Sequence, residues 1–161
     1  MKTFVDTAGR MWVISLTLGS AMHVKDALGV DLLEPEAGDP PLITRLGTDE
    51  MLLGQVICSL LAGQFEAHHV TEQQVRDAFD GNTLLAAQKA FYAELVDFFH
   101  QRGRGDRAKA VAAQARMIEA AVKAVEAKLD AIDTEAVIRT AMGRGAMSGS
   151  SLEPSASTPG L

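Results

Sequence analysis

Aromatic residues are scarce in this chain of 161 residues. Only 5% of the residues are Phe, Tyr or Trp, although 47% are hydrophobic. A core with few large rings has to be built from Leu, Val, Ile, Ala and Met, which suits packed helices. The composition therefore favours a mainly helical domain with a modest core.

Cysteine occurs once, at Cys58, which excludes an internal disulfide framework and indicates a reducing compartment. A nucleophilic thiol needs an electropositive, partly open site. The neighbours of Cys58 between Val56 and Leu61 are mostly apolar. We therefore expect Cys58 to be a small buried hydrophobic residue.

Long apolar runs are missing as well. The longest apolar region, Met51 to Gly63, is interrupted by Gln55 and is too short to cross a bilayer. Asp6, Gly9 and Arg10 interrupt the first residues, so no secretory leader is recognisable. We expect a soluble, cytoplasmic protein.

Catalytic motifs are also absent. The chain has no nucleophile elbow, phosphate-binding loop or dinucleotide fingerprint. His68 and His69, near Glu66 and Glu72, form the one cluster that resembles a metal site, but adjacent histidines point apart on a regular element. We expect no enzyme activity, no catalytic residues, no metal and no cofactor.

Charge is distributed unevenly along the chain, whose net charge is −6. Residues 1–100 hold 6 basic and 14 acidic side chains (−8), whereas residues 101–145 hold 9 and 6 (+3). An acidic body argues against nucleic acid as the main partner. The basic group is either a nucleic-acid or acidic-partner contact or, as we favour in the absence of interleaved aromatics, a solvated helix start. Its members are Arg102, Arg104, Arg107, Lys109 and Arg116.

Local signals predict a β-hairpin followed by helices. Two β-prone runs between Thr3 and Thr17 flank a turn at Asp6–Gly9, and Trp12, Ile14 and Leu16 alternate with smaller or polar residues. A short helix is expected from Ser20 to Gly29, and a proline-containing loop from Glu34 to Pro41.

Three further helices are expected before residue 105. Thr48 is the predicted cap of a helix from about Asp49 to Ala67. Thr71 and Gln74 form a predicted capping box. Another helix is expected to begin at Thr83 and to carry the phenylalanines up to Phe99 into the core.

From Asp106 to about Met142 the chain is rich in Ala and charge and carries apolar residues at alternating spacings of 4 and 3. We call this set the heptad seam: Val111, Ala115, Ile118, Val122, Val125, Leu129, Ile132 and Ala136. The seam belongs either to a helix that folds back as part of the core or to one that offers it to another helix. For the second case the candidate partner-binding residues are Val111, Ile118, Val122, Val125, Leu129 and Ile132.

These signals predict an α+β, mainly α fold with three parts. Residues 1–105 form a globular domain in which an N-terminal β-hairpin precedes a helical bundle, and residues 106–142 form a long heptad-patterned C-terminal helix. Residues 143–161 are rich in Ser, Gly and Pro, and we expect them to be disordered.

Two segments carry a resemblance to a known family. They are Thr3–Trp12, which reads TFVDTAGRMW, and His23–Leu33, which reads HVKDALGVDLL. With the Phe/Leu-rich helix around Ala90–Phe99, they make the first 100 residues or so resemble the tail assembly chaperones of long-tailed bacteriophages and prophages. The Ser/Gly/Pro-rich residues 143–161 resemble a hinge found in that family, where programmed ribosomal frameshifting appends a second domain.

The resemblance implies a non-catalytic partner in virion morphogenesis, in the cytoplasm of the bacterial host. Such chaperones bind the helical tape measure protein and recruit tail-tube subunits, so these are the implied partners, with possible self-association. The heptad seam would be the contact, and Leu52, Val56 and Leu60 would serve self-association or the core. One alternative is a structural virion protein, such as a tail-completion or head–tail connector subunit. Another is a small helical regulatory protein with an enzyme or DNA partner.

Overall fold

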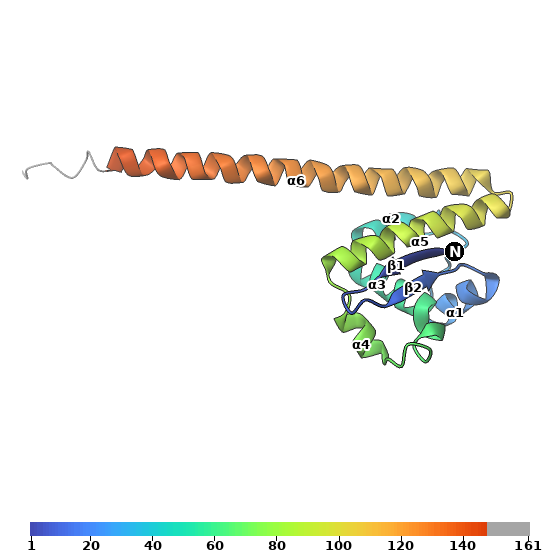
Figure 1. Ribbon diagram of the computed structural model, residues 1–161. Coiled ribbons are helices and arrows are strands. Elements are labelled where there is room, and N and C mark those ends of the chain that lie inside the picture. The colour runs from blue at the N-terminus through green and yellow to red at the C-terminus, as the bar shows by residue number, and fades with distance from the viewer. Residues whose placement is uncertain (148–161) are drawn as a thin grey trace, which may run out of the picture. The chain divides into compact units, whose positions relative to one another are not determined.

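The computed structural model describes residues 1–147 and confirms a mainly helical protein with an N-terminal hairpin (Figure 1). Residues 1–118 form one compact unit, and residues 119–147 belong to a second. The first unit therefore extends past the predicted boundary at residue 105. The predicted disordered tail lies, from residue 148, outside the described residues, and residues 143–147 belong to the last helix.

The hairpin pairs β1 (Lys2–Val5) with β2 (Met11–Ile14) in antiparallel register, with Phe4 opposite Trp12. Gly9 adopts a φ of +78°, which the turn requires and which glycine adopts without strain. The alternation predicted for the second strand is confirmed, because Trp12, Ile14 and Leu16 are buried.

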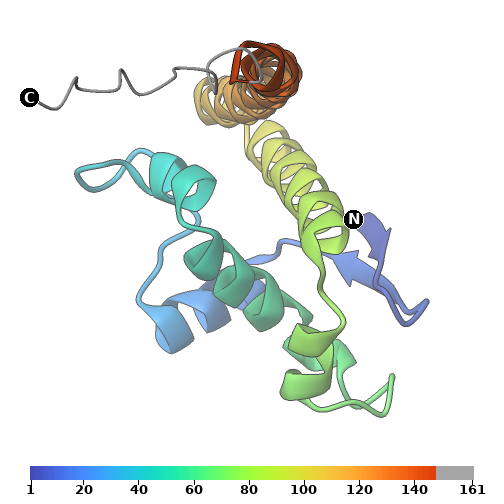
Figure 2. The ribbon, with the colours of Figure 1, turned by 90° about the vertical axis from the view of Figure 1, so that its left-hand side faces the viewer.

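The first helix, α1 (Leu18–Leu28), begins slightly earlier than predicted. Thr17 caps it: its side chain accepts a hydrogen bond from Ser20 N, and the Ser20 hydroxyl accepts one from Thr17 N. Gly29 ends it with a φ of +68°. Helix α1 packs against α3 (Figure 2).

The middle of the chain differs from the prediction of one helix over residues 49–67. A separate helix, α2 (Leu42–Thr48), precedes α3 (Glu50–Leu61), and a 3₁₀ turn, η1 (Ala62–Gln64), follows it. Thr48 is the last residue of α2, and Asp49 is the cap of α3, accepting a hydrogen bond from Leu52 N. The extended backbone of Asp49 separates the two helices, and the buried side chains of α2 explain why seven residues form a helix here.

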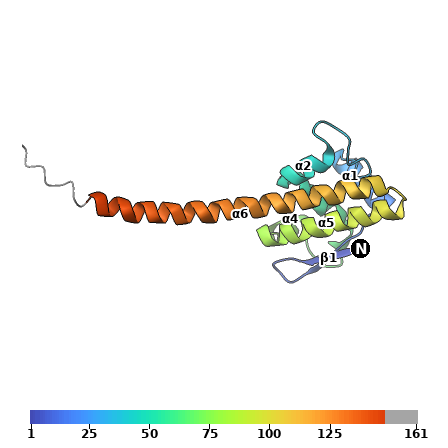
Figure 3. The same cartoon turned by 90° about the horizontal axis from the view of Figure 1, so that it is seen from above.

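The predicted capping box is confirmed at α4 (Glu72–Asp77), where Thr71 and Gln74 exchange hydrogen bonds. Helix α5 (Gly81–Gln101) begins two residues before the predicted start at Thr83, because Asp80 caps it and accepts a hydrogen bond from Thr83 N. The N-terminal strand β1 lies along α5 (Figure 3).

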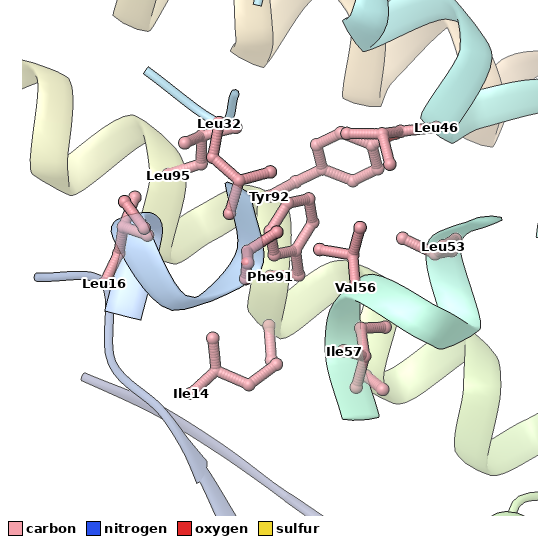
Figure 4. Close-up of a cluster of buried hydrophobic side chains, with 14 of the residues drawn as sticks. Ile14, Leu16, Leu32, Leu46, Leu53, Val56, Ile57, Phe91, Tyr92 and Leu95 are labelled. Atoms are coloured by element: carbon pink, nitrogen blue, oxygen red, sulfur yellow. The ribbon is translucent and has the colours of Figure 1, made fainter. Parts of the chain in front are cut away.

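The core lies between the hairpin, α1, α3 and α5. Figure 4 shows Phe91 of α5 toward Val56 of α3, while Leu95 lies beside Leu32 and the ring of Tyr92 lies toward Leu46. Val56 is fully buried, while Leu52 and Leu60 are partly buried against the core. Of the two roles expected for these three residues, the core role is therefore the one the structure supports.

Candidate interaction surface

The last helix, α6 (Gly105–Met147), carries the heptad seam, and its first turns belong to the compact unit. Ala108 and Val111 are fully buried there, and Ala115 and Ile118 pack against the core. The prediction that Val111 binds a partner is therefore wrong: its side chain already fills the protein's own core. Ile118 is only partly available for the same reason.

Close approach between α6 and α2 depends on a glycine. A Cβ placed on Gly47 would lie 2.6 Å from Cδ1 of Ile118 and 3.1 Å from its Cγ1. Any side chain at residue 47 would push Ile118 away, because real Cβ contacts are longer than this. Gly47 therefore permits Ile118 to pack where it does.

Arg107 ties the first turn of α6 to the loop after α1. Its Nη1 donates to the carbonyl oxygen of Leu33 at 2.5 Å, and Nη2 is paired with Glu36. Its guanidinium also lies over the ring of Phe99, 5.9 Å from the centroid. Arg104 is likewise paired with Asp106, at 2.7 Å. Two members of the predicted basic group, Arg104 and Arg107, are therefore paired with acids within the protein.

Beyond Ile118 the seam changes character completely. The side chains of Val122, Val125, Leu129 and Ile132 are 43%, 55%, 54% and 58% exposed. We call these four residues the exposed seam. At alternating spacings of 3 and 4 they line one face of the helix, so they form a continuous apolar stripe. Residues 119–147, which contain it, extend over roughly 43 Å of helix.

Two local, exposed ion pairs lie on this part of α6. Lys123 lies 3.8 Å from Glu119, and Arg139 lies 3.7 Å from Glu135, both at the i, i+4 spacing. Exposed pairs of this kind contribute roughly 0.3–0.5 kcal/mol each. They support the helix but leave the apolar stripe uncovered, so this face offers a hydrophobic contact with polar margins.

A buried carboxylate organises the hairpin, which sequence reasoning did not anticipate. Asp6 accepts hydrogen bonds from the amides of Ala8 and Arg10, from Arg10 Nε and from Trp12 Nε1, all at 2.8–2.9 Å. Burial alone would raise the pKa of Asp6, but the hydrogen bonds from Trp12 and Arg10 outweigh it and hold that pKa below its ordinary value. Because every partner lies within the hairpin, this cluster serves structure.

A second buried carboxylate fastens the hairpin to α5. Glu94 accepts a hydrogen bond from Leu16 N at 3.0 Å, and its other oxygen lies 2.6 Å from the amino group of Met1. The hydrogen-bonding capacity and the charge of this buried carboxylate are therefore satisfied within the fold. Glu94 is therefore a structural residue too.

The residues considered for chemistry are accounted for by burial and packing. Cys58 is buried as predicted, and burial raises the pKa of its thiol, which opposes thiolate formation. The His68 ring packs against Trp12, with the ring centroids 4.5 Å apart. In residues 1–147 no group of three or more His, Cys, Asp or Glu side chains is arranged to hold a metal ion. No helix in the described part of the chain has the length and apolar character needed to cross a membrane.

Comparison with known proteins returned no match: no family model, no curated protein and no solved structure is significantly similar to this chain.

Proposed function

We propose that this chain is a non-catalytic tail assembly chaperone of a long-tailed phage or prophage, acting in the cytoplasm of the bacterial host. Its partners would be the tape measure protein and tail-tube subunits. The resemblance of the first 100 residues supplies the family, and the exposed seam is the observation that supports a binding role.

The physical argument for binding is the uncovered apolar area. Burying a Val, Leu or Ile side chain stabilises a complex by roughly 1.5–3 kcal/mol, and the exposed seam offers four such side chains, each partly exposed. A tape measure protein with apolar helical stripes would be a matching partner, since amphipathic helices pair through residues at i, i+3, i+4 and i+7. The acidic body, with a net charge of −6 for the chain, would keep a crowded complex soluble.

The test is affinity capture from the native host during particle production. The bait carries a tag at its N-terminus, and captured proteins are identified by mass spectrometry. A very long helical protein, tail-tube subunits, or a larger species that shares residues 1–140 would support the chaperone proposal.

Two substitutions test whether capture depends on the exposed seam. Val125→Asp places a charge in the seam and should abolish capture, whereas Ala127→Asp places the same charge on an exposed residue outside it and should not. Equal capture by both variants would remove the seam from the proposal. Abundant protein in purified particles, with none of these partners captured, would favour the structural virion subunit. Capture of a host enzyme alone would contradict both.

A further inference from the structure

The exposed seam of α6 has two unlike margins. In its heptad pattern Val122 and Leu129 occupy position a, and Val125 and Ile132 occupy position d. On the side of position a three exposed acids follow one another at spacings of four and three. We call them the acidic margin: Glu126, Asp130 and Asp133. The side of position d is mostly alanine, and its residues are Ala121, Ala124, Lys128 and Ala131.

The acidic margin has no cation of its own. Within residues 1–147 no basic side chain is paired with any of its three carboxylates. Lys123, the nearest lysine on that side, lies 3.8 Å from Glu119. Lys128 stands two residues from Glu126 and from Asp130, and helical side chains at that spacing do not face one another. The three carboxylates therefore repel one another along one side of the helix, and an approaching cation would relieve that repulsion.

A second copy of the chain fits the apolar residues of the seam but not its margins. In an antiparallel pair Val122 would lie opposite Ile132 of the second copy, and Val125 opposite its Leu129. The same register places Glu126 opposite Glu126 of the second copy. Like charges across an interface are costly, so the acidic margin opposes this dimer.

Other pairings of two copies meet further obstacles. Sliding the antiparallel pair by one heptad places Glu126 opposite Asp133 of the second copy, which is again a pair of acids. A parallel pair in register would bring Lys128 near Asp133 of the second copy. At the start of that interface, however, Ala115 and Ile118 of each copy already pack against its own core. The exposed seam therefore favours a partner that is not a copy of this chain.

We infer that the partner of the exposed seam is a helix of another protein with Lys and Arg along one side of its apolar face. The inference rests on the binding role proposed above and adds the chemistry of the partner. Apolar residues at i, i+3, i+4 and i+7 of that helix cover the seam and its alanine side, where small side chains permit close approach. Its Lys and Arg side chains cross the apolar edge with their stems and place their charges on the acidic margin.

Two synthetic amphipathic peptides of equal length test the charge requirement. They share the same apolar residues, and one is flanked by Lys where the other is flanked by Glu. Each is labelled and titrated with the full chain, and binding is followed by fluorescence anisotropy. The lysine peptide should bind about tenfold more tightly, because it exchanges repulsion along the margin for attraction.

A triple variant assigns this preference to the acidic margin. Glu126→Gln, Asp130→Asn and Asp133→Asn together remove its charge and keep the size of each side chain. The lysine peptide should then bind about fivefold more weakly. Circular dichroism should show the same helix content as in the unaltered chain, because the substitutions lie on an exposed surface.

A second triple variant is the matched control. Ala120→Lys, Ala127→Lys and Thr134→Lys change the net charge by the same amount on the exposed face opposite the seam. Because salt screens charges at that distance, binding of the lysine peptide should weaken less than about twofold. Equal weakening in the two triple variants would show that net charge alone acts, and would overturn the inference.

Carbodiimide cross-linking of the complex captured from the host identifies the contact in the native partner. The reagent joins a carboxylate to a neighbouring amine as an amide and takes up the water that is lost. Mass spectrometry should find lysines of a captured helical protein joined to Glu126, Asp130 or Asp133. Links from these acids to a second copy, recognised by mixing isotope-labelled and unlabelled chain, would overturn the inference.

Two further results would overturn it. One is equal binding of the lysine and glutamate peptides. The other is a dimer in sedimentation equilibrium that becomes monomeric in Leu129→Asp, which would make a second copy the occupant of the seam. Failure of the proposed function is a separate result: capture without tail proteins contradicts that proposal, whereas the peptide titrations still decide the chemistry of the partner.

Discussion

Helix α5 and the part of α6 after Ile118 carry apolar residues at similar helical spacings, but these residues are buried in α5 and exposed in α6. In α5, Phe91, Leu95 and Phe99 are 1–2% exposed, whereas Val125 and Leu129 of α6 are more than half exposed. The same contrast occurs within α6 itself, where Val111 is fully buried and Val125, two heptads later, is not. Periodicity determines which side chains share a face, but only a neighbouring element buries them.

The largest expected effect comes from placing the same residue, Asp, at a buried leucine of α5 and at an exposed leucine of α6. Leu95→Asp puts a charge among buried apolar side chains and should cost more than about 4 kcal/mol, enough to abolish cooperative folding. Leu129→Asp should cost less than about 1 kcal/mol, mostly through helix propensity. Urea unfolding followed by Trp12 fluorescence measures both. A large loss in Leu129→Asp would show that the exposed seam is a core element after all.

Asp6→Ala should destabilise the compact unit by about 3 kcal/mol, because it leaves Trp12 Nε1 and Arg10 without their buried acceptor. Chemical denaturation gives the value. Asp133→Ala, on the exposed part of α6, is the control and should change the midpoint within about 0.5 kcal/mol. Similar losses in both variants would contradict the structural role assigned to the Asp6 cluster.

Acid should weaken the compact unit for the same reason. The pKa of Asp6 is held below the ordinary value of 3.8, and hydrogen bonding by Lys25 lowers that of Asp31 against the opposing effect of burial. A lowered folded-state pKa stabilises the fold above the unfolded value, and this stabilisation is lost as pH falls through the folded pKa. Urea midpoints between about pH 5 and pH 2 should therefore decline. In Asp6→Asn the decline should be shallower, and an equal slope would exclude Asp6 as a contributor.

Two helix glycines give the smallest expected effect and locate the point where α6 joins the compact unit. Gly54→Ala meets no atom within 4 Å and should stabilise the protein by up to about 1 kcal/mol through helix propensity. In Gly47→Ala the added Cβ would lie 2.6 Å from Cδ1 of Ile118, and the substitution should destabilise the protein by about 1 kcal/mol. Adding Ile118→Val, which removes the nearest atom, should restore most of that loss. Additive effects of Gly47→Ala and Ile118→Val would show that the two residues are not in contact.

Local signals were sufficient for much of the fold. The hairpin turn at Asp6–Gly9, the capping box at Thr71 and the start of the last helix need only neighbouring residues, so the sequence predicts them. Helix α2 was missed because its seven residues are too few for a helical period and follow a proline-rich segment. The cap at Asp49 was missed because Thr48 is an equally good capping residue by type, and only the packing of α2 assigns it to the preceding helix.

The candidate site divides in the same way. The positions of the heptad seam follow from spacing alone, and Val122, Val125, Leu129 and Ile132 are exposed as a binding surface requires. Val111 could not be separated from them by sequence, because its burial depends on residues distant along the chain. The closed edge of β2 was equally hidden, since the side chain that closes it is Gln64, 51 residues after Val13.

The sequence by itself determined the elements whose causes are local: turns that need glycine, helix ends that need a hydrogen-bonding cap, and the apolar face of each long helix. Tertiary structure alone decided which of those faces are covered and which backbone edges are closed. The physical reason is that capping and periodicity act over a few residues, whereas burial and strand pairing require groups far apart in the chain to meet.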